Sequence, residues 1–393
     1  MSMSIGRPTI QSWMTAACAV AGVLATGSSG CAATAQTAGI GSSSGPPHAS
    51  INDARATVVE PVFLELAGPI ADPQAEISGL TWKDDMLIIL PQFPDRFAEA
   101  GELGFFTLTR DEILAAIDGE HTGPITPRRV TCHAPGLSRI VRGFDGLEAI
   151  GLIGDRCYLS IEADEDTVMA GYLASGRYDS QNEAIVMDLE RLTAIPLGLN
   201  IPNLAEETML IVDGEILTIG EANGANVNPH PVAKRFDAEL EYLGTVPLPQ
   251  IEYRVTDATR VDDDGRFWVI NYLWPGDRKI LKPADDPELP LDPNAKPDPD
   301  QCVERLLELR LVRKEVGGQA TSDAGGEVRH AVGAGVGQWS RIERTDTPPI
   351  YLALQPDGVC RNWEAIAELE GRGFLVMTDK YPTTLLAFVP YDF

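Results

Sequence analysis

The stretch NWEAIAELEGRGFLVMTDKYP, residues 362–382, decides the fold class. Two apolar runs flank a glycine turn, and this pattern predicts a β-hairpin. The hairpin opens with one carboxylate, Glu364, and closes with another, Asp379. Because the strands of a hairpin run antiparallel, both carboxylates are expected at the same rim. The sequence therefore predicts a strand pair that is apolar along its length and acidic at one rim.

The same pattern occurs four more times along the chain. Each copy begins with an acid, continues through an apolar run and an Asp or Gly turn, and ends on a second acid or amide after 14 to 16 residues. The other copies span residues 76–92, 148–162, 207–221 and 257–271. Such regularity indicates one supersecondary unit that is used five times.

Shorter apolar segments between the hairpins predict further strands. They span residues 104–110, 183–192, 233–248, 303–314 and 384–390. A repeated unit of about four strands is typical of a β-propeller blade, whereas a helical fold is excluded because 37 glycines and 29 prolines interrupt the apolar runs. We predict an all-β, five-bladed β-propeller, with six blades as the alternative because the gap before the last hairpin is long. Residues 58–66 are expected to supply the outer strand of the last blade and so close the ring.

The N-terminal region is typical of an exported protein. Residues 13–26 form an apolar run of signal-peptide length, which is too short for a transmembrane helix. A small-residue stretch ends at Cys31, which predicts a lipoprotein signal over residues 1–31, with cleavage after Ala35 as the alternative. Residues 32–56 are small and polar and predict a flexible linker before a single domain over 57–393. We expect a periplasmic, outer-membrane-anchored or secreted protein that contacts the membrane only through a lipid on Cys31.

The net charge limits the classes of binding partner, and the cysteine content bears on the redox state of the compartment. The chain has a net charge of −27 at pH 7, which argues against nucleic acid and anionic membrane surfaces because both require clustered Lys and Arg. Four cysteines follow the N-terminal region: Cys132, Cys157, Cys302 and Cys360. An even number permits two disulfides in any of three connectivities, while buried thiols with at most one bridge are the alternative.

The acids that open the five hairpins form the main candidate site. In a propeller the first strand of each hairpin lines the central channel, so these acids should meet at one mouth. They are Glu76, Glu148, Glu207, Asp257 and Glu364. Like charges about 4 Å apart repel by about 4 kcal/mol at an effective dielectric constant of 20, so the ring requires a cation or bound protons. Ca²⁺ is the predicted metal because it accepts irregular sets of oxygen ligands. The alternative is that each acid binds backbone N–H groups of the next blade and sets the register.

Two arginines accompany these acids. Arg254 and Arg361 each stand three residues before an acid, and aromatic side chains such as Trp274 and Tyr381 follow the closing ends of the hairpins. Carboxylates, arginines and an aromatic rim together predict a mouth that holds a metal-bridged anion such as a phosphate ester. The alternative is that the arginines neutralise the acids as ion pairs. The candidate catalytic residues are Glu148, Glu207, Arg254 and Arg361, with a carboxylate activating water beside the metal.

The motifs EISGLTW, GLEAIGL…LSIE and NWEAIAEL…GFLVMTDKYP resemble the exported bacterial β-propellers called phytase-like or esterase-like. The similarity extends across most of residues 57–393, and the acid-opened strands are also similar to those of calcium-dependent apyrases. The resemblance implies a calcium-binding propeller with phosphoesterase activity. Separately, we expect a monomer that acts on a small anionic substrate or binds an envelope ligand. The alternative function is a non-catalytic propeller that binds a glycan, a peptide or an envelope protein.

Overall fold

The computed structural model describes residues 56–286, 288–289, 298, 300–314, 339–356 and 358–393. These residues belong to one compact unit, Asp53–Phe393. The predicted signal sequence, nearly all of the predicted linker and parts of the long segments near residues 282–300 and 315–337 lie outside the described residues. In the described part of the chain, no helix has the length and apolar character needed to cross a membrane.

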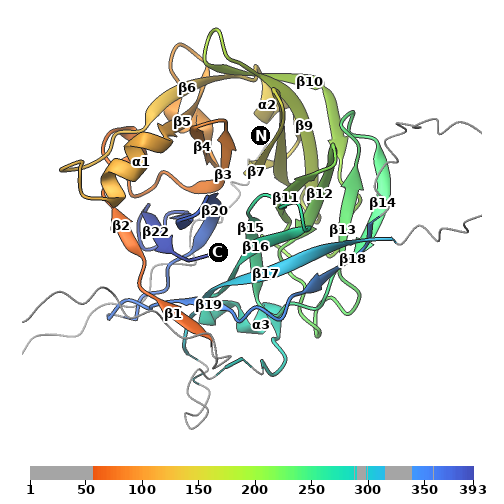
Figure 1. Ribbon diagram of the computed structural model, residues 1–393. Helices are drawn as coiled ribbons and strands as arrows, with labels where there is room; N and C mark the ends of the chain where they lie inside the picture. Colours follow the sequence, from red (N-terminus) through yellow and green to blue (C-terminus); the bar gives the residue numbers. More distant parts are fainter. Residues whose placement is uncertain (1–55, 287, 290–297, 299, 315–338, 357) are drawn as a thin grey trace, which may run out of the picture. The chain divides into compact units, whose positions relative to one another are not determined.

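All five hairpins predicted from the sequence are confirmed. They are β3 (Ile77–Lys83) with β4 (Met86–Pro91), β7 (Phe144–Ile153) with β8 (Arg156–Asp164), β11 (Glu206–Val212) with β12 (Glu215–Gly220), β15 (Arg254–Ala258) with β16 (Arg266–Leu273), and β20 (Trp363–Leu369) with β21 (Gly373–Thr378). Their first strands contact one another in the order β3, β7, β11, β15, β20 and back to β3. These strands therefore close a ring around the centre of the unit (Figure 1).

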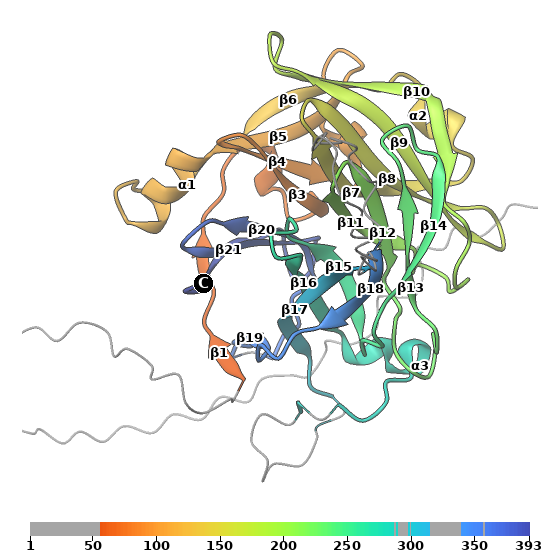
Figure 2. The same ribbon diagram turned by 45° about the vertical axis from the view of Figure 1, so that its right-hand side comes forward.

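Outer strands extend each hairpin into a sheet. They are β5 (Leu103–Thr109) and β6 (Arg128–His133), β9 (Met169–Asp179) and β10 (Ala184–Ala194), β13 (Val232–Phe236) and β14 (Tyr242–Pro247), β17 (Val303–Arg313), β18 (Trp339–Arg344) and β19 (Ile350–Leu352), and β22 (Leu386–Pro390). Figure 2 shows β10 and β14 on the outside of the unit. The first two sheets join into one of eight strands because β6 and β10 pair in parallel, with Thr131 opposite Ala184.

The N-terminal segment closes the ring as predicted, and also does more. The strand β2 (Val62–Leu64) pairs with β22, with Val62 opposite Phe388. Just before it, β1 (Thr57–Val59) pairs in parallel with β19 in the fourth sheet. The segment therefore joins the fourth and fifth sheets, and it covers edges that would otherwise be free to pair with other chains.

Short helices occupy some of the connections. They are η1 (Pro69–Ala71), η2 (Pro94–Phe97), α1 (Arg110–Ile117), α2 (Leu137–Ile140), η3 (Pro275–Asp277) and α3 (Arg278–Leu281). The sequence analysis did not predict α1. Thr109 and Glu112 form a capping box that satisfies free N–H groups in its first turn.

Each pair of neighbouring sheets buries its own hydrophobic cluster. Representative pairs across these interfaces are Ile89 with Leu375, Leu90 with Leu159, Tyr158 with Phe236, Leu210 with Val269, and Trp268 with Phe374. Burial of one large apolar side chain contributes about 1.5–3 kcal/mol. The fold is therefore a β-propeller in which the core lies between the sheets, and the polar groups at the ends of the inner strands are left to line the centre.

One disulfide joins the fourth and fifth sheets. Cys302, directly before β17, is bonded to Cys360, near the start of β20. Cys132 and Cys157 are buried thiols. The structure thus has the arrangement of one bridge and two buried thiols, which was one of the alternatives left open by the sequence.

Candidate functional site

Arg254 lies at the end of the ring where the hairpins open and close on acidic residues. It is the first residue of β15, and it follows Tyr253, whose φ of 74° lies in the left-handed region. The Arg254 Nε donates to Glu221, while its Nη2 lies 3.4 Å from Glu207 Oε1 and 3.8 Å from Glu364 Oε1. Asp277 Oδ2 lies 4.0 Å from Nη1, so four carboxyl groups surround one guanidinium group. We call Arg254, Glu207, Glu221 and Glu364, together with Glu148 and Glu162, described next, the Arg254 cluster.

Glu148 and Glu162 come from the second hairpin. Gln92 Nε2 donates to Glu148 Oε1 at 3.0 Å. Burial raises the pKa of Glu148 well above its ordinary value, and the neighbouring charge of Glu162 raises it further. Burial and the charge of Glu221 raise the pKa of Glu162 to about 8. No hydrogen-bond donor among the described residues reaches the buried Oε1 of Glu162.

Glu207 and Glu364 form a carboxyl pair beside Arg254. Burial raises the pKa of Glu207 well above its ordinary value, and the charges of Glu221 and Glu364 add to this effect. Burial also raises the pKa of Glu364, to about 8, although the charge of Arg254 opposes the rise. Asn362 Nδ2 donates to Glu364 Oε1 at 2.5 Å. No hydrogen-bond partner among the described residues reaches the buried Oε2 of Glu207.

The charge balance of the Arg254 cluster requires protonation. The cluster holds five buried carboxyl groups and one guanidinium group, and the first cause of each raised carboxyl pKa is burial. Charged carboxylates are disfavoured in such surroundings, so part of the cluster holds protons at neutral pH. Neutral and ionised carboxyl groups therefore lie side by side, which is the arrangement that proton transfer requires.

The structure holds Glu76 and Asp257 by other contacts. Glu76 Oε2 lies 2.6 Å from Arg96 Nη1, and its Oε1 pairs with Lys380. Asp257 Oδ2 accepts a hydrogen bond from the backbone N–H of Ile366 in β20 at 2.8 Å. Asp257 therefore fixes β15 against its neighbour in the ring, whereas Glu76 is neutralised by cations.

Arg361 is directed away from the Arg254 cluster. It is completely buried, and its Nη2 lies 2.7 Å from Glu304 Oε2. Glu304 also accepts a hydrogen bond from Trp363 Nε1 at 2.8 Å. The structure thus brings together Glu148, Glu207, Glu364 and Arg254 from the predicted site, while Arg361 contributes to packing between the fourth and fifth sheets.

Sequence reasoning missed two members of the cluster. Glu162 and Glu221 close the second and third hairpins, one at the end of each repeat. Antiparallel pairing places a closing residue beside an opening residue, so Glu162 lies opposite Gly146 and Glu221 follows β12. The closing acids carry the same repeat signal as the opening acids, and this is the sequence feature that marks Glu162 and Glu221.

Two exposed aromatic residues follow the closing ends of hairpins. Trp274, after β16, is 43% exposed, and Tyr381, after β21, is 44% exposed. Tyr381 is adjacent to Lys380, whose ammonium group pairs with Glu76. The acidic end of the ring therefore has apolar surface near buried carboxyl groups.

The predicted calcium site does not fit the side chains as they are arranged. Among the described residues, no group of three or more His, Cys, Asp or Glu side chains could hold a metal ion. Glu162 Oε1 and Glu207 Oε2 have no donor and could accept a cation. However, the Arg254 guanidinium already lies among the carboxyl groups that were expected to surround the metal.

No model of a known protein family matches the sequence, and no curated protein matches it either. Several solved structures are similar in part. A candidate glycoside hydrolase from Bacteroides ovatus has 10% sequence identity and a TM-score of 0.45, with 84% of this chain and 96% of that chain covered. A glucose dehydrogenase has 13% identity and a TM-score of 0.36, with coverages of 82% and 98%. An α-L-arabinofuranosidase from Clostridium thermocellum has 10% identity and a TM-score of 0.39, with coverages of 77% and 81%. At these levels the likenesses assign no activity and no site residue to this chain.

Proposed function

We propose that the protein is an exported β-propeller hydrolase that cleaves a neutral carboxylic ester with the Glu207–Glu364 carboxyl pair. The observation that carries the proposal is that both buried carboxyl groups lie beside one nitrogen, with the Oε1 atoms of Glu207 and Glu364 3.4 Å and 3.8 Å from Arg254 Nη2, while burial raises the pKa of each. Two carboxyl groups that share a proton can activate a water molecule and protonate a carbonyl oxygen in the same step. The proposal includes five blades, one for each first strand of the ring.

The contacts of the two carboxyl groups suggest their roles. We assign the proton to Glu207, whose Oε2 has no hydrogen-bond partner among the described residues, and the carboxylate to Glu364, whose Oε1 accepts a hydrogen bond from Asn362 Nδ2 at 2.5 Å. The Glu364 carboxylate takes a proton from water as the water oxygen bonds to the ester carbonyl carbon, and Glu207 gives its proton to the carbonyl oxygen. When the C–O bond to the alcohol breaks, Glu364 returns its proton to the leaving oxygen. Glu207 recovers its proton from the new hydroxyl group. Arg254 positions both carboxyl groups.

A neutral substrate suits the charges better than a phosphate ester. Arg254 is surrounded by carboxyl groups, and Lys380 and Arg96 pair with Glu76. These three cations are therefore already paired with carboxyl groups.

The test uses the purified full chain and a panel of 4-nitrophenyl esters, nucleotides, inositol phosphates and 4-nitrophenyl glycosides, each with and without EDTA. We expect ester hydrolysis that survives EDTA. Its rate should rise as the pH passes about 8, where Glu364 ionises, and should fall again when Glu207 loses its proton. Glu207→Gln and Glu364→Gln should each lower kcat by about 10²-fold or more.

Glu120→Gln is the matched control, since Glu120 is exposed and distant in sequence from every member of the cluster. It should retain full activity. Hydrolysis of phosphate esters that requires calcium would contradict the proposal and would support the calcium site expected from the sequence. Cleavage of glycosides without cleavage of esters would also contradict it.

A non-catalytic binding propeller is the second candidate, and the exposed rings of Trp274 and Tyr381 favour it. Aromatic rings that are exposed near a polar centre can stack on a sugar or on an apolar side chain of a partner. This function predicts saturable glycan or peptide binding that Trp274→Ala weakens, with no turnover of any substrate in the panel.

A further inference from the structure

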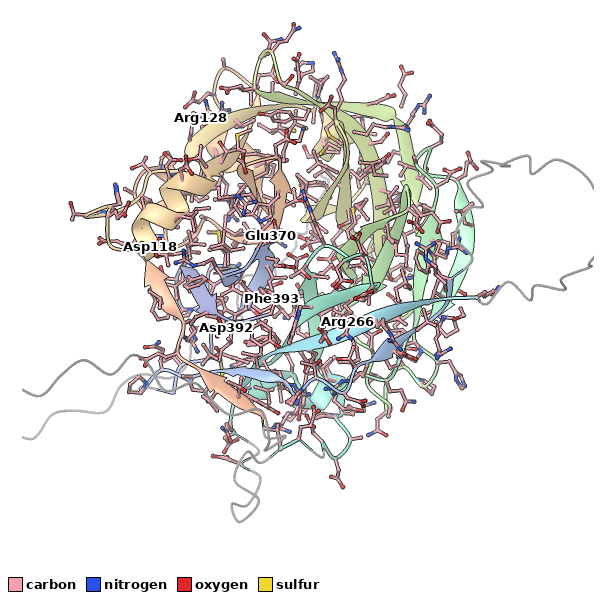
Figure 3. All side chains as sticks on the ribbon, viewed as in Figure 1. Asp118, Arg128, Arg266, Glu370, Asp392 and Phe393 are labelled. Carbon is pink, nitrogen blue, oxygen red and sulfur yellow. A yellow bond between two sulfur atoms is a disulfide. The ribbon has the colours of Figure 1, made fainter. Side chains whose placement is uncertain are left out.

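A cavity of about 210 Å³ lies between the second and third sheets, at the end of the ring where the hairpins close. Gly220 and Glu221, which end the third hairpin, form part of its wall. Glu370, labelled in Figure 3, belongs to a hairpin turn and marks the opposite end of the ring. We call the cavity the Lys234 pocket, after the lysine of β13 that lines it.

The wall of the Lys234 pocket combines apolar and polar side chains from different segments. The connection between the second and third sheets contributes an apolar part with Ile195, Leu199 and Leu204. The third sheet and the loop after β12 contribute a polar part, which consists of Glu206, Glu221, Asn223, Asn228, His230 and Lys234. The volume is below the range of about 300–1,000 Å³ that is usual for drug-sized ligands. The pocket therefore suits a small ligand that has both an apolar face and polar groups.

Lys234 and Glu206 form a buried ion pair in the polar part. Their side chains are 6% and 12% exposed. An ammonium group has three N–H donors, and Glu206 Oε1 is the one acceptor that Lys234 has among the described residues. Buried donors in native proteins are nearly always satisfied. The remaining N–H groups of Lys234 are therefore available to a ligand in the pocket.

The polar part also offers oxygen atoms that can accept hydrogen bonds from a ligand. Thr218 Oγ1 donates to Glu206 Oε2 at 2.8 Å, and each carboxylate oxygen has a second lone pair for a further donor. The amide nitrogens of Asn223 and Asn228 donate to backbone carbonyl oxygens at 2.6 Å and 3.2 Å. The side-chain oxygens of these two asparagines therefore remain as acceptors.

Two glycines leave space beside the ion pair. A Cβ atom at Gly198 would lie 3.2 Å from Lys234 Nζ, and one at Gly220 would lie 3.2 Å from Glu206 Oε1. Neither glycine has a φ in the left-handed region, so the backbone does not require glycine at either position. The missing side chains therefore leave the charged atoms of the ion pair open to the pocket.

We propose that the Lys234 pocket binds a neutral sugar ring, with two neighbouring hydroxyl groups on Lys234 and Glu206. A hydroxyl group can accept a hydrogen bond from the ammonium group or donate one to the carboxylate, and hydrogen bonds to charged groups are stronger than those between neutral groups. The C–H groups of the ring pack against Ile195, Leu199 and Leu204.

The charges of the pocket favour a neutral ligand over a charged one. The ion pair of Lys234 and Glu206 is already balanced, and Glu221 adds a further carboxyl group to the wall. A charged ligand would lose its hydration without gaining a free counter-charge. Glu221 also belongs to the Arg254 cluster, but the inference concerns binding alone and does not depend on the ester hydrolase proposal.

Isothermal titration calorimetry of the purified full chain with D-glucose, D-galactose and D-mannose tests this assignment. We expect one saturable site for at least one of these sugars. Gly198→Val should weaken the binding of that sugar by about tenfold or more, because the new side chain enters the space beside Lys234. The double variant Lys234→Met with Glu206→Gln, which removes both charges together, should weaken it by a similar factor.

The matched control is Ala194→Val, which adds the same branched side chain to an exposed residue that does not line the pocket. It should bind the sugar as the wild type does. The uronate of the best-binding hexose should bind more weakly than the hexose, because it adds a charge. Cyclohexanol should also bind more weakly, because it keeps only one hydroxyl group.

Four results would overturn the proposal. The first is a lack of saturable binding of all three sugars by the wild-type chain. The second is wild-type affinity in either pocket variant when its thermal unfolding matches that of the wild type, which shows that the variant is folded. The third is a uronate that binds as tightly as its hexose, because the pocket would then accept an anion. The fourth is cyclohexanol binding as tightly as the hexose, because the polar groups would then contribute nothing.

Discussion

Replacement of Arg254 by methionine tests the electrostatics of the central cluster directly. The guanidinium lies 3.4 Å from Glu207, 3.8 Å from Glu364 and in contact with Glu221. At an effective dielectric constant of about 20, each of the two longer contacts corresponds to a Coulomb energy of about 4–5 kcal/mol. Desolvation of the buried ions offsets much of this gain, so removal of the cation should destabilise the fold by about 3–5 kcal/mol.

The free energy of unfolding that the Arg254→Met variant loses should increase as the pH rises. Without Arg254 the neighbouring carboxyl groups have their pKa raised further, because burial remains and the favourable charge is gone. Groups whose pKa is higher in the folded state than in the unfolded state destabilise the fold progressively as the pH rises. At pH 5 these carboxyl groups are protonated and the variant should lose little more than packing. At pH 9 it should show the full loss.

Urea unfolding followed by tryptophan fluorescence at pH 5 and pH 9 measures the loss in the free energy of unfolding and its dependence on pH. The control is Arg266→Met, which removes a partly exposed arginine that lies 3.1 Å from Glu308. A partly exposed pair contributes about 0–1 kcal/mol, so this control should change little at either pH. An Arg254→Met variant that loses the same free energy of unfolding at both pH values would refute the electrostatic account of the cluster.

Three further predictions concern the same framework. The wild-type fold should lose stability as the pH rises from about 4.5 to about 8, because the pKa of Glu364 is about 8 in the folded state and near 4.3 in an unfolded chain; urea midpoints that rise over this interval would contradict this. Asp257→Ala should cost about 1–3 kcal/mol, since the buried N–H of Ile366 loses its acceptor, and Asp257→Asn, which keeps an acceptor oxygen, should recover part of the loss in the same unfolding assay. Replacement of both Cys302 and Cys360 by serine should lower the free energy of unfolding by about 2–5 kcal/mol. A double variant with the same melting temperature as the oxidised wild type would show that the bridge adds no stability.

Local sequence signals determined the hairpins. An apolar run, a turn residue and a second apolar run specify a strand pair without reference to the rest of the chain. Residues 76–92 and 364–379 are therefore recognisable as copies of one unit, and both are hairpins in the structure. The pairing of residues 62–64 with the last sheet was also predictable, because a ring of sheets needs a strand to close it.

Tertiary structure decided which charges meet. Lys380 pairs with Glu76 across 304 residues of sequence, and Arg361 pairs with Glu304 between two sheets although it stands three residues before Glu364. Arg254, at the same spacing from its own acid, instead joins Glu207 and Glu364. The spacing is identical in the two cases, but a charge pairs with the nearest counter-charge in space. That distance depends on how the sheets are arranged around the ring, so the repeat predicted an acidic mouth and only the folded ring selected the carboxyl groups that share one guanidinium.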